Sequence, residues 1–117
     1  LPDATQKYRN EQRRESLMHV PTIHLNGTPA GRLQEPLCEA HSALNETLDK
    51  LAECAPNGRD YYPQGEAAIN EATREHRARL TAIQAVMADL LAIHEAIDDA
   101  VALRELMQTT TWEVKRR

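Results

Sequence analysis

The longest uninterrupted helical pattern in the sequence begins near Glu66 and reaches Gln108 without a proline or a glycine. Between positions 76 and 101 the residues of its apolar stripe recur at steps of three and four, which predicts one amphipathic helix. A helix of about 40 residues is about 60 Å long, whereas the average helix has about 11–12 residues. Such a length points to a helical hairpin or a coiled coil. The apolar stripe comprises Ile69, His76, Leu80, Ile83, Met87, Leu90, Ile93, Ile97, Val101 and Leu106.

A second helix is predicted upstream, from about Pro29 or Glu35 to Ala55. Its apolar residues also recur at steps of three and four. Pro36 removes a backbone donor, so the helix either kinks at this position or begins near it. We expect Pro56 to end the helix, with Asn57-Gly58 as a left-handed cap. The stripe comprises Leu33, Leu37, Ala40, Leu44, Leu48, Leu51 and Ala55.

The two ends of the chain have a different pattern from its middle. Residues 20–25 predict a short strand or an extended piece, and Asn26-Gly27 predicts a turn after it. We expect Thr28 to be the N-cap of the following helix and Pro29 its first residue. Residues 109–117 form a basic tail whose β-branched run predicts an extended segment. The predicted organisation is therefore a polar arm or short helix over 1–19, a helical hairpin domain over 20–108 and an extended tail over 109–117.

The predicted fold class is all-α, a long antiparallel helical hairpin with short extended N- and C-terminal segments. The stripe of the second helix is too wide for one neighbour, since apolar residues adjoin one another in it. We therefore expect a homo-oligomer, with two hairpins forming a four-helix bundle; the alternative is that the N-terminal segment covers the extra surface. The predicted oligomer interface is Leu80, Ile83, Met87, Leu90, Ile97 and Val101.

Composition narrows the function classes. The apolar content of 41% is that of a folded chain, and no stretch approaches the roughly 20 apolar residues of a membrane span. The acidic region 35–108 lies between basic ends, and a sequence pI of about 5.7 argues against a dedicated nucleic-acid binder. Cys38 and Cys54 lie about 24 Å apart on one helix and cannot bridge, which predicts reduced thiols in a cytoplasmic protein, or an intermolecular disulfide.

Catalytic and metal-binding patterns are sparse. Cys38 and His41 share a helix face and could form half of a zinc site, which His76 or His94 would complete, but no second clear pair of ligands follows. The chain has no phosphate loop and no nucleophile elbow. We therefore predict no enzyme activity, no cofactor and no metal site.

The segment between the helices contains the remaining candidate site. Arg59, Asp60, Tyr61 and Tyr62 cluster there, and tyrosine and arginine are favoured in protein interfaces. The structural alternative is that the tyrosines pack against Leu51 and Ile69 as a plug. We predict that these four residues bind a protein partner.

Two segments carry a family resemblance. Ile23-His24-Leu25-Asn26-Gly27-Thr28 and Asn57-Gly58-Arg59-Asp60-Tyr61-Tyr62-Pro63-Gln64-Gly65 resemble a family of uncharacterised small helical proteins encoded by phages and prophages. Residues 75–80 are similar to the start of the second helix in that family, whose members begin near Met18 and lack a proline at position 36. The resemblance implies a phage setting and no catalytic residue.

The expected function is that of a phage accessory or interaction protein in the host cytoplasm, binding a protein partner. The alternative is a structural virion component, such as a small coat, connector or decoration protein, that exchanges terminal strands with its neighbours. A third class is a metal-binding or nucleic-acid-binding module.

Overall fold

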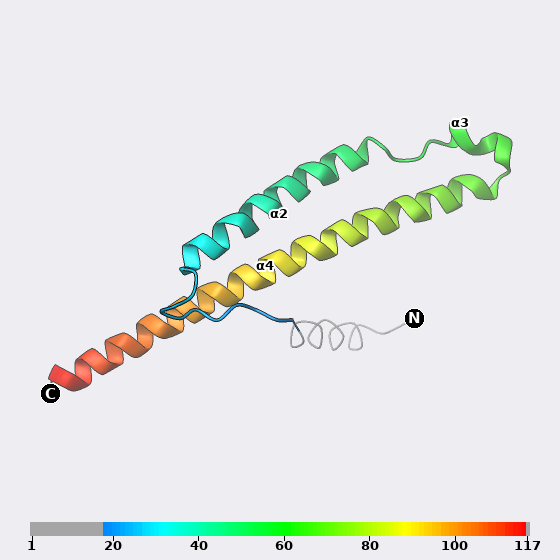
Figure 1. The fold of residues 1–117 in the computed structure, drawn as a ribbon. Helices are drawn as coiled ribbons and strands as arrows, with labels where there is room; N and C mark the ends of the chain where they lie inside the picture. Colours follow the sequence, from blue (N-terminus) through cyan, green and yellow to red (C-terminus); the bar gives the residue numbers. More distant parts are fainter. Residues whose placement is uncertain (1–17, 117) are drawn as a thin grey trace, which may run out of the picture. The chain divides into compact units, whose positions relative to one another are not determined.

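The computed structural model describes residues 18–116, with side chains described for residues 18–108. In order along the chain, the described part contains helix α2 (Ala30–Ala52), helix α3 (Gly58–Tyr61), the 3₁₀ helix η1 (Tyr62–Gln64) and helix α4 (Ala67–Arg116) (Figure 1). None of these described residues forms a strand. The predicted all-α class is therefore confirmed. The arm predicted for residues 1–19 lies, as far as residue 17, outside the described part.

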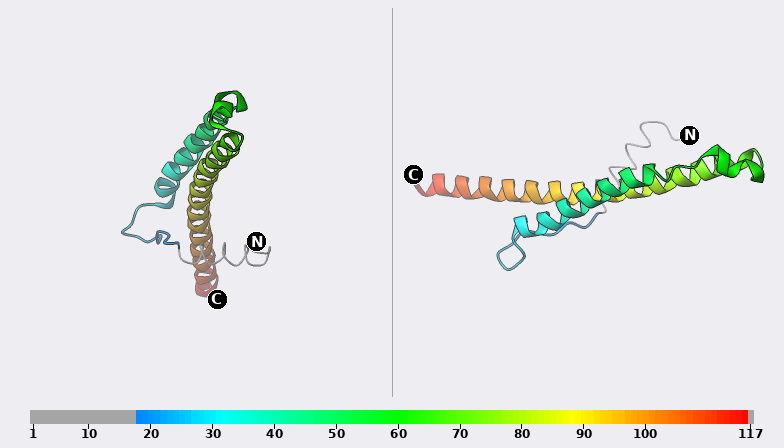
Figure 2. Two further views of the ribbon diagram at one scale, coloured as in Figure 1. Left: turned by 90° about the vertical axis from the view of Figure 1, so that its right-hand side faces the viewer. Right: turned by 90° about the horizontal axis from the view of Figure 1, so that it is seen from above.

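Helix α4 is one helix of 50 residues, and it stays unbroken in every view (Figure 2). It begins at Ala67, one residue after the position predicted. The prediction of an extended tail is wrong, because α4 continues through residues 109–116. Thr109–Thr111 favour strand only weakly, and lengthening an existing helix avoids the cost of nucleating a new one.

Helix α2 has 23 residues and runs through Pro36 instead of beginning there. The carbonyl of Pro29 accepts hydrogen bonds from the backbone N–H groups of Arg32 and Leu33, at 3.0 and 3.2 Å. The helix therefore begins one residue after Pro29, the earlier of the two predicted starts. After Ala52 the chain tightens, and successive i to i−3 backbone bonds lead to Ala55.

The segment before α2 has no regular secondary structure, so of the two forms predicted for residues 20–25, a short strand or an extended piece, the strand is absent from this described stretch. A short strand needs a partner for its backbone groups, and residues 109–116, the other segment predicted to be extended, are helical. The turn at Asn26-Gly27 is confirmed, because the N–H of Gly27 donates to the carbonyl of His24 at 3.1 Å.

The chain divides into two compact units. One is Gln34–Leu91, which contains most of α2, the whole of α3 and η1, and the first half of α4. The other joins Leu1–Leu33 to Ala92–Arg117.

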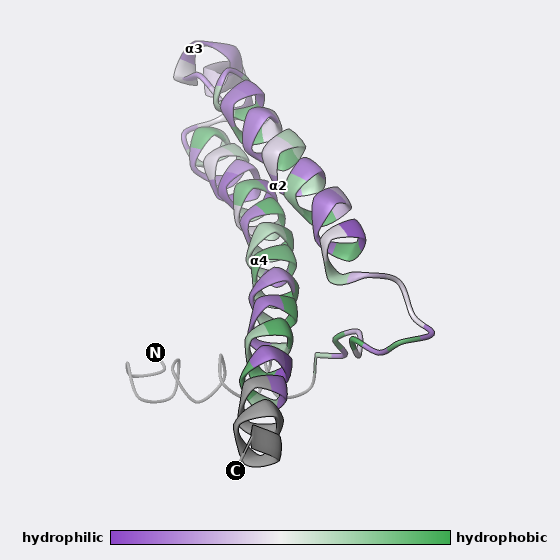
Figure 3. Ribbon diagram, turned by 90° about the vertical axis from the view of Figure 1, so that its left-hand side faces the viewer, coloured by the Kyte–Doolittle hydropathy of each residue, from purple (hydrophilic) through white to green (hydrophobic). Residues whose placement is uncertain are grey.

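Few of the described side chains are buried in either unit. In the unit Gln34–Leu91 the buried residues are His76 and Met87, and in the other unit Ile97 is fully buried, at 0% exposure. No residue of α2 is buried, but Leu37, His41, Leu44, Leu48 and Leu51 are half-buried. Hydrophobic residues recur between polar ones along α4 (Figure 3). The described core therefore consists of narrow helical stripes.

Candidate functional site

The predicted partner-binding residues lie on two consecutive short helical turns. Asn57 is in extended conformation and caps α3, since its side-chain oxygen accepts a hydrogen bond from the N–H of Arg59 at 3.0 Å. The N–H of Asp60 donates to the Asn57 carbonyl at the same distance. The expectation that Asn57-Gly58 forms a left-handed cap of the preceding helix is therefore wrong. Asparagine is also a favoured N-cap, and here it opens a helix.

Pro63 and Gly65 close this turn. Pro63 occupies the start of η1, where its missing N–H costs no helical hydrogen bond. Gly65 has a φ of 110°, the one positive φ in the described part of the chain, and its N–H donates to the Tyr62 carbonyl at 3.1 Å. Only glycine adopts this conformation without strain. The sequence thus fixes both ends of the turn.

The four residues differ in exposure. Tyr62 is exposed at 76%, and Arg59 and Asp60 are also exposed. Tyr61 is half-buried. A plug of two tyrosines would require both rings to be covered, and Tyr62 is not. The structure therefore presents one aromatic ring to solvent, and an exposed cationic and an exposed anionic residue precede it on α3.

The six residues predicted as an oligomer interface are the less exposed side of α4. Met87 and Ile97 are buried, and Leu80, Ile83, Leu90 and Val101 are half-buried. The large apolar residues that α4 does expose include Val86, Leu91 and Leu103. These six residues are therefore already wholly or partly covered within a single chain.

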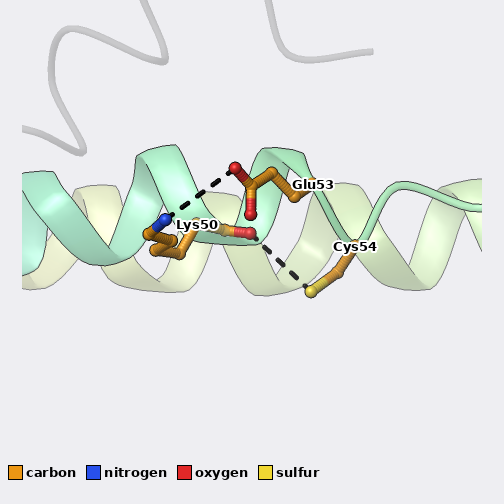
Figure 4. Close-up of polar contacts among 3 residues, drawn as sticks. All are labelled: Lys50, Glu53 and Cys54. Atoms are coloured by element: carbon orange, nitrogen blue, oxygen red, sulfur yellow. Dashed lines mark hydrogen bonds and ion pairs between the residues drawn. The ribbon is translucent and has the colours of Figure 1, made fainter.

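The cysteine region shows no ligand cluster. The described residues contain no group of three or more His, Cys, Asp or Glu side chains placed to hold a metal ion. Cys38 and Cys54 are both free thiols and exposed. At the end of α2 the thiol of Cys54 donates to the Lys50 carbonyl at 3.7 Å, while the Lys50 ammonium lies 3.9 Å from a Glu53 carboxylate oxygen (Figure 4). These local contacts are those of a helix end.

A hollow that the sequence does not predict lies in the unit that joins the first residues to the second half of α4. Its volume is about 280 Å³, and it is open to solvent. The lining residues are Met18, Val20, Ala92, Glu95, Ala96 and Asp99. Two carboxylates one turn apart thus stand beside apolar side chains. The i, i+4 spacing of Glu95 and Asp99 was visible in the sequence, whereas the position of Met18 and Val20 depends on tertiary structure.

One helix is long and apolar enough, by length and composition, to cross a membrane. It is α4 between Ala67 and Gln108, whose most apolar 18 residues have a mean hydropathy of 1.4. This corrects the expectation that no stretch approaches such a span. Asp89 and Glu95 interrupt the apolar part, and a carboxylate costs about 2.5–3.5 kcal/mol at the centre of a spanning helix. The alternation of apolar and polar positions is typical of a helix that packs on another helix.

Comparison with protein-family models, with curated proteins and with solved structures finds no match.

Proposed function

We propose that this chain is a non-enzymatic interaction protein that binds a protein partner through the turn Gly58–Gln64 and through helix faces. The observation that carries the proposal is the exposure of Tyr62, at 76%, on a turn whose ends are fixed by Asn57 and Gly65. A fixed turn presents an aromatic ring at a small cost in conformational entropy on binding, because tyrosine has few rotatable bonds. Arg59 and Asp60 beside it supply charges for orientation.

The proposal includes a hairpin in which α2 pairs antiparallel with α4. Both helices have half-buried residues at alternating steps of three and four, as helices packed side by side require. The unit Gln34–Leu91 contains most of α2, the connecting residues 53–66 and the first half of α4. That both helices contribute to one compact unit supports their pairing.

Self-association is the second part of the proposal. Since α2 has 23 residues and α4 has 50, α2 can lie along less than half of α4. Two hairpins forming a four-helix bundle would give the remaining length a neighbour. The resemblance of residues 23–28 and 57–65 to small phage and prophage proteins supports a role during infection, in the host cytoplasm.

The alternative of a virion component loses one of its supports. It relied on terminal strands exchanged between neighbours, and residues 109–116 are helical.

The test compares capture by the immobilised chain with capture by two variants. We expect wild type to retain a specific protein from host lysate and Tyr62→Ala to lose it, with the helical circular dichroism unchanged. The matched control is Leu25→Ala, an exposed apolar side chain outside the turn, at 88% exposure. Equal capture by Tyr62→Ala and wild type would contradict the proposed role of the turn.

A further inference from the structure

The face of α4 opposite its buried stripe has an unusual composition. Successive residues of a helix are about 100° apart, so steps of three and four from Arg74 trace one face lying opposite Met87 and Ile97. Every residue of this face is exposed or half-buried. We call it the back face; it comprises Arg74, Arg77, Ala78, Thr81, Ala85, Ala88, Ala92, Glu95, Ala96 and Asp99.

The charges of the back face are separated by sign. Arg74 and Arg77 lie at one end, and Glu95 and Asp99 lie at the other. The ion pairs recorded among residues with described side chains include none of these four. From Arg74 to Glu95 the helix advances about 31 Å, so the two ends cannot pair within one helix. Between them the face has only alanines and one threonine.

We propose that a second copy of this chain docks antiparallel on the back face, so that the basic end of each α4 meets the acidic end of the other. The inference rests on the self-association in the proposed function. It joins the two copies through the back faces of α4 instead of through a four-helix bundle built on the predicted interface residues, and it assigns the direction of the pair. In this antiparallel pair the two-fold symmetry axis passes midway between Ala85 and Ala88. Arg74 then lies opposite Asp99 of the second copy. The same register sets Ala85 opposite Ala88 of the second copy.

Small side chains and symmetry both favour this arrangement. Alanines at the crossing allow the helix axes to approach to about 8 Å. The two-fold repeats each opposite-charge pair, so all eight charges of the two copies find a partner of opposite sign. A parallel pair would instead set arginine against arginine and carboxylate against carboxylate.

The hollow beside Glu95 and Asp99 fits an arginine from the second copy. Its carboxylates can accept hydrogen bonds from a guanidinium, while Met18 and Val20 offer an apolar surface to the methylene stem. Leu103, which is 59% exposed, extends the same face beyond Asp99. The proposed register sets it opposite Asn70 of the second copy.

Charge reversal tests the surface and its direction. The variants Arg74→Glu with Arg77→Glu, and Glu95→Arg with Asp99→Arg, each make the face single-signed. By sedimentation equilibrium we expect each to raise the dimer Kd at least about tenfold. An equimolar mixture of the two, and the chain carrying all four changes, recover association near the wild-type Kd. Arg104→Glu, an exposed position away from the back face, leaves the Kd unchanged.

Cross-linking tests the orientation. In a chain with Cys38 and Cys54 changed to serine, we expect Ala85→Cys mixed with Ala88→Cys to form a disulfide faster than either variant alone. Faster cross-linking of each variant alone indicates a parallel pair and overturns the proposal. A wild-type chain that stays monomeric, or reversals that leave the Kd unchanged, also overturns it.

The two proposals fail separately. A monomeric chain whose protein capture still depends on Tyr62 overturns the inference and leaves the role of the turn intact. A dimer with the expected charge dependence but no Tyr62-dependent capture supports the inference and contradicts the proposed role of the turn.

Discussion

The side-chain Oδ1 atom of Asn57 accepts a hydrogen bond from the backbone N–H of Arg59, with 3.0 Å between oxygen and nitrogen. This bond satisfies one of the donors left open at the start of α3 and holds the turn that displays Tyr62. We expect Asn57→Ala to lower the free energy of unfolding by about 1 kcal/mol, as the loss of an N-cap does elsewhere. Asn57→Asp keeps an acceptor oxygen and serves as the control. Equal losses in the two variants, measured by urea unfolding, would show that the cap is unimportant.

Gly65 is predicted to be intolerant of a side chain. Its φ of 110° lies in a region that residues with a Cβ rarely adopt, although a Cβ there would meet no atom within 4 Å. Gly65→Ala should therefore destabilise the chain by about 1 kcal/mol or more through backbone strain alone. Gly31, inside α2, has the same open surroundings, so Gly31→Ala should instead stabilise by about 0.5–1 kcal/mol. In thermal unfolding we therefore expect Gly65→Ala to lower Tm and Gly31→Ala to raise it. Shifts in the same direction would contradict the role assigned to the φ of Gly65.

Pro36 is predicted to weaken α2. It lies in the interior of the helix, where a proline lacks the N–H that would bond to the Arg32 carbonyl. Replacing Pro36 by alanine should raise the free energy of unfolding by about 1–3 kcal/mol. Part of this gain is offset, because the unfolded chain has more conformational entropy without the proline. Denaturant midpoints measure this gain. A loss of stability in Pro36→Ala would mean that the proline has a native role beyond helix geometry.

Ile97 is predicted to be the most sensitive apolar position among the described side chains of α4. Its side chain is fully buried, so Ile97→Ala should cost about 2–5 kcal/mol. Leu91→Ala, on the same helix but half exposed, should cost about 0.5 kcal/mol or less. Chemical unfolding at one fixed protein concentration compares the two, since any dimer would add a concentration-dependent contribution. Similar losses would show that α4 is not packed as described.

Much of the fold follows from hydrophobic periodicity and from glycine and proline. The start of α4 was predicted within one residue, because Gly65 and an uninterrupted pattern define it. The end was not, since Thr109–Thr111 have a local preference for strand that a long helix overrides. Asn57 was misassigned because asparagine serves both helix starts and turns, and only the preceding chain geometry distinguishes them.

The candidate site was predictable in part. The cluster Arg59–Tyr62 is evident from composition, but the difference in exposure between Tyr61 and Tyr62 is a tertiary property. The hollow at Glu95 and Asp99 depends on where Met18 and Val20 come to lie, which no local pattern determines.

Because α4 is one unbroken helix, only some insertions and deletions within it are compatible with its packing. Deleting one residue near its middle rotates everything downstream by about 100°, which would turn Ile97 out of its enclosure. Removing seven residues rotates it by only about 20°. Natural length variants should therefore differ in α4 by whole heptads, whereas the stretch 53–57, outside any helix, can accept single insertions.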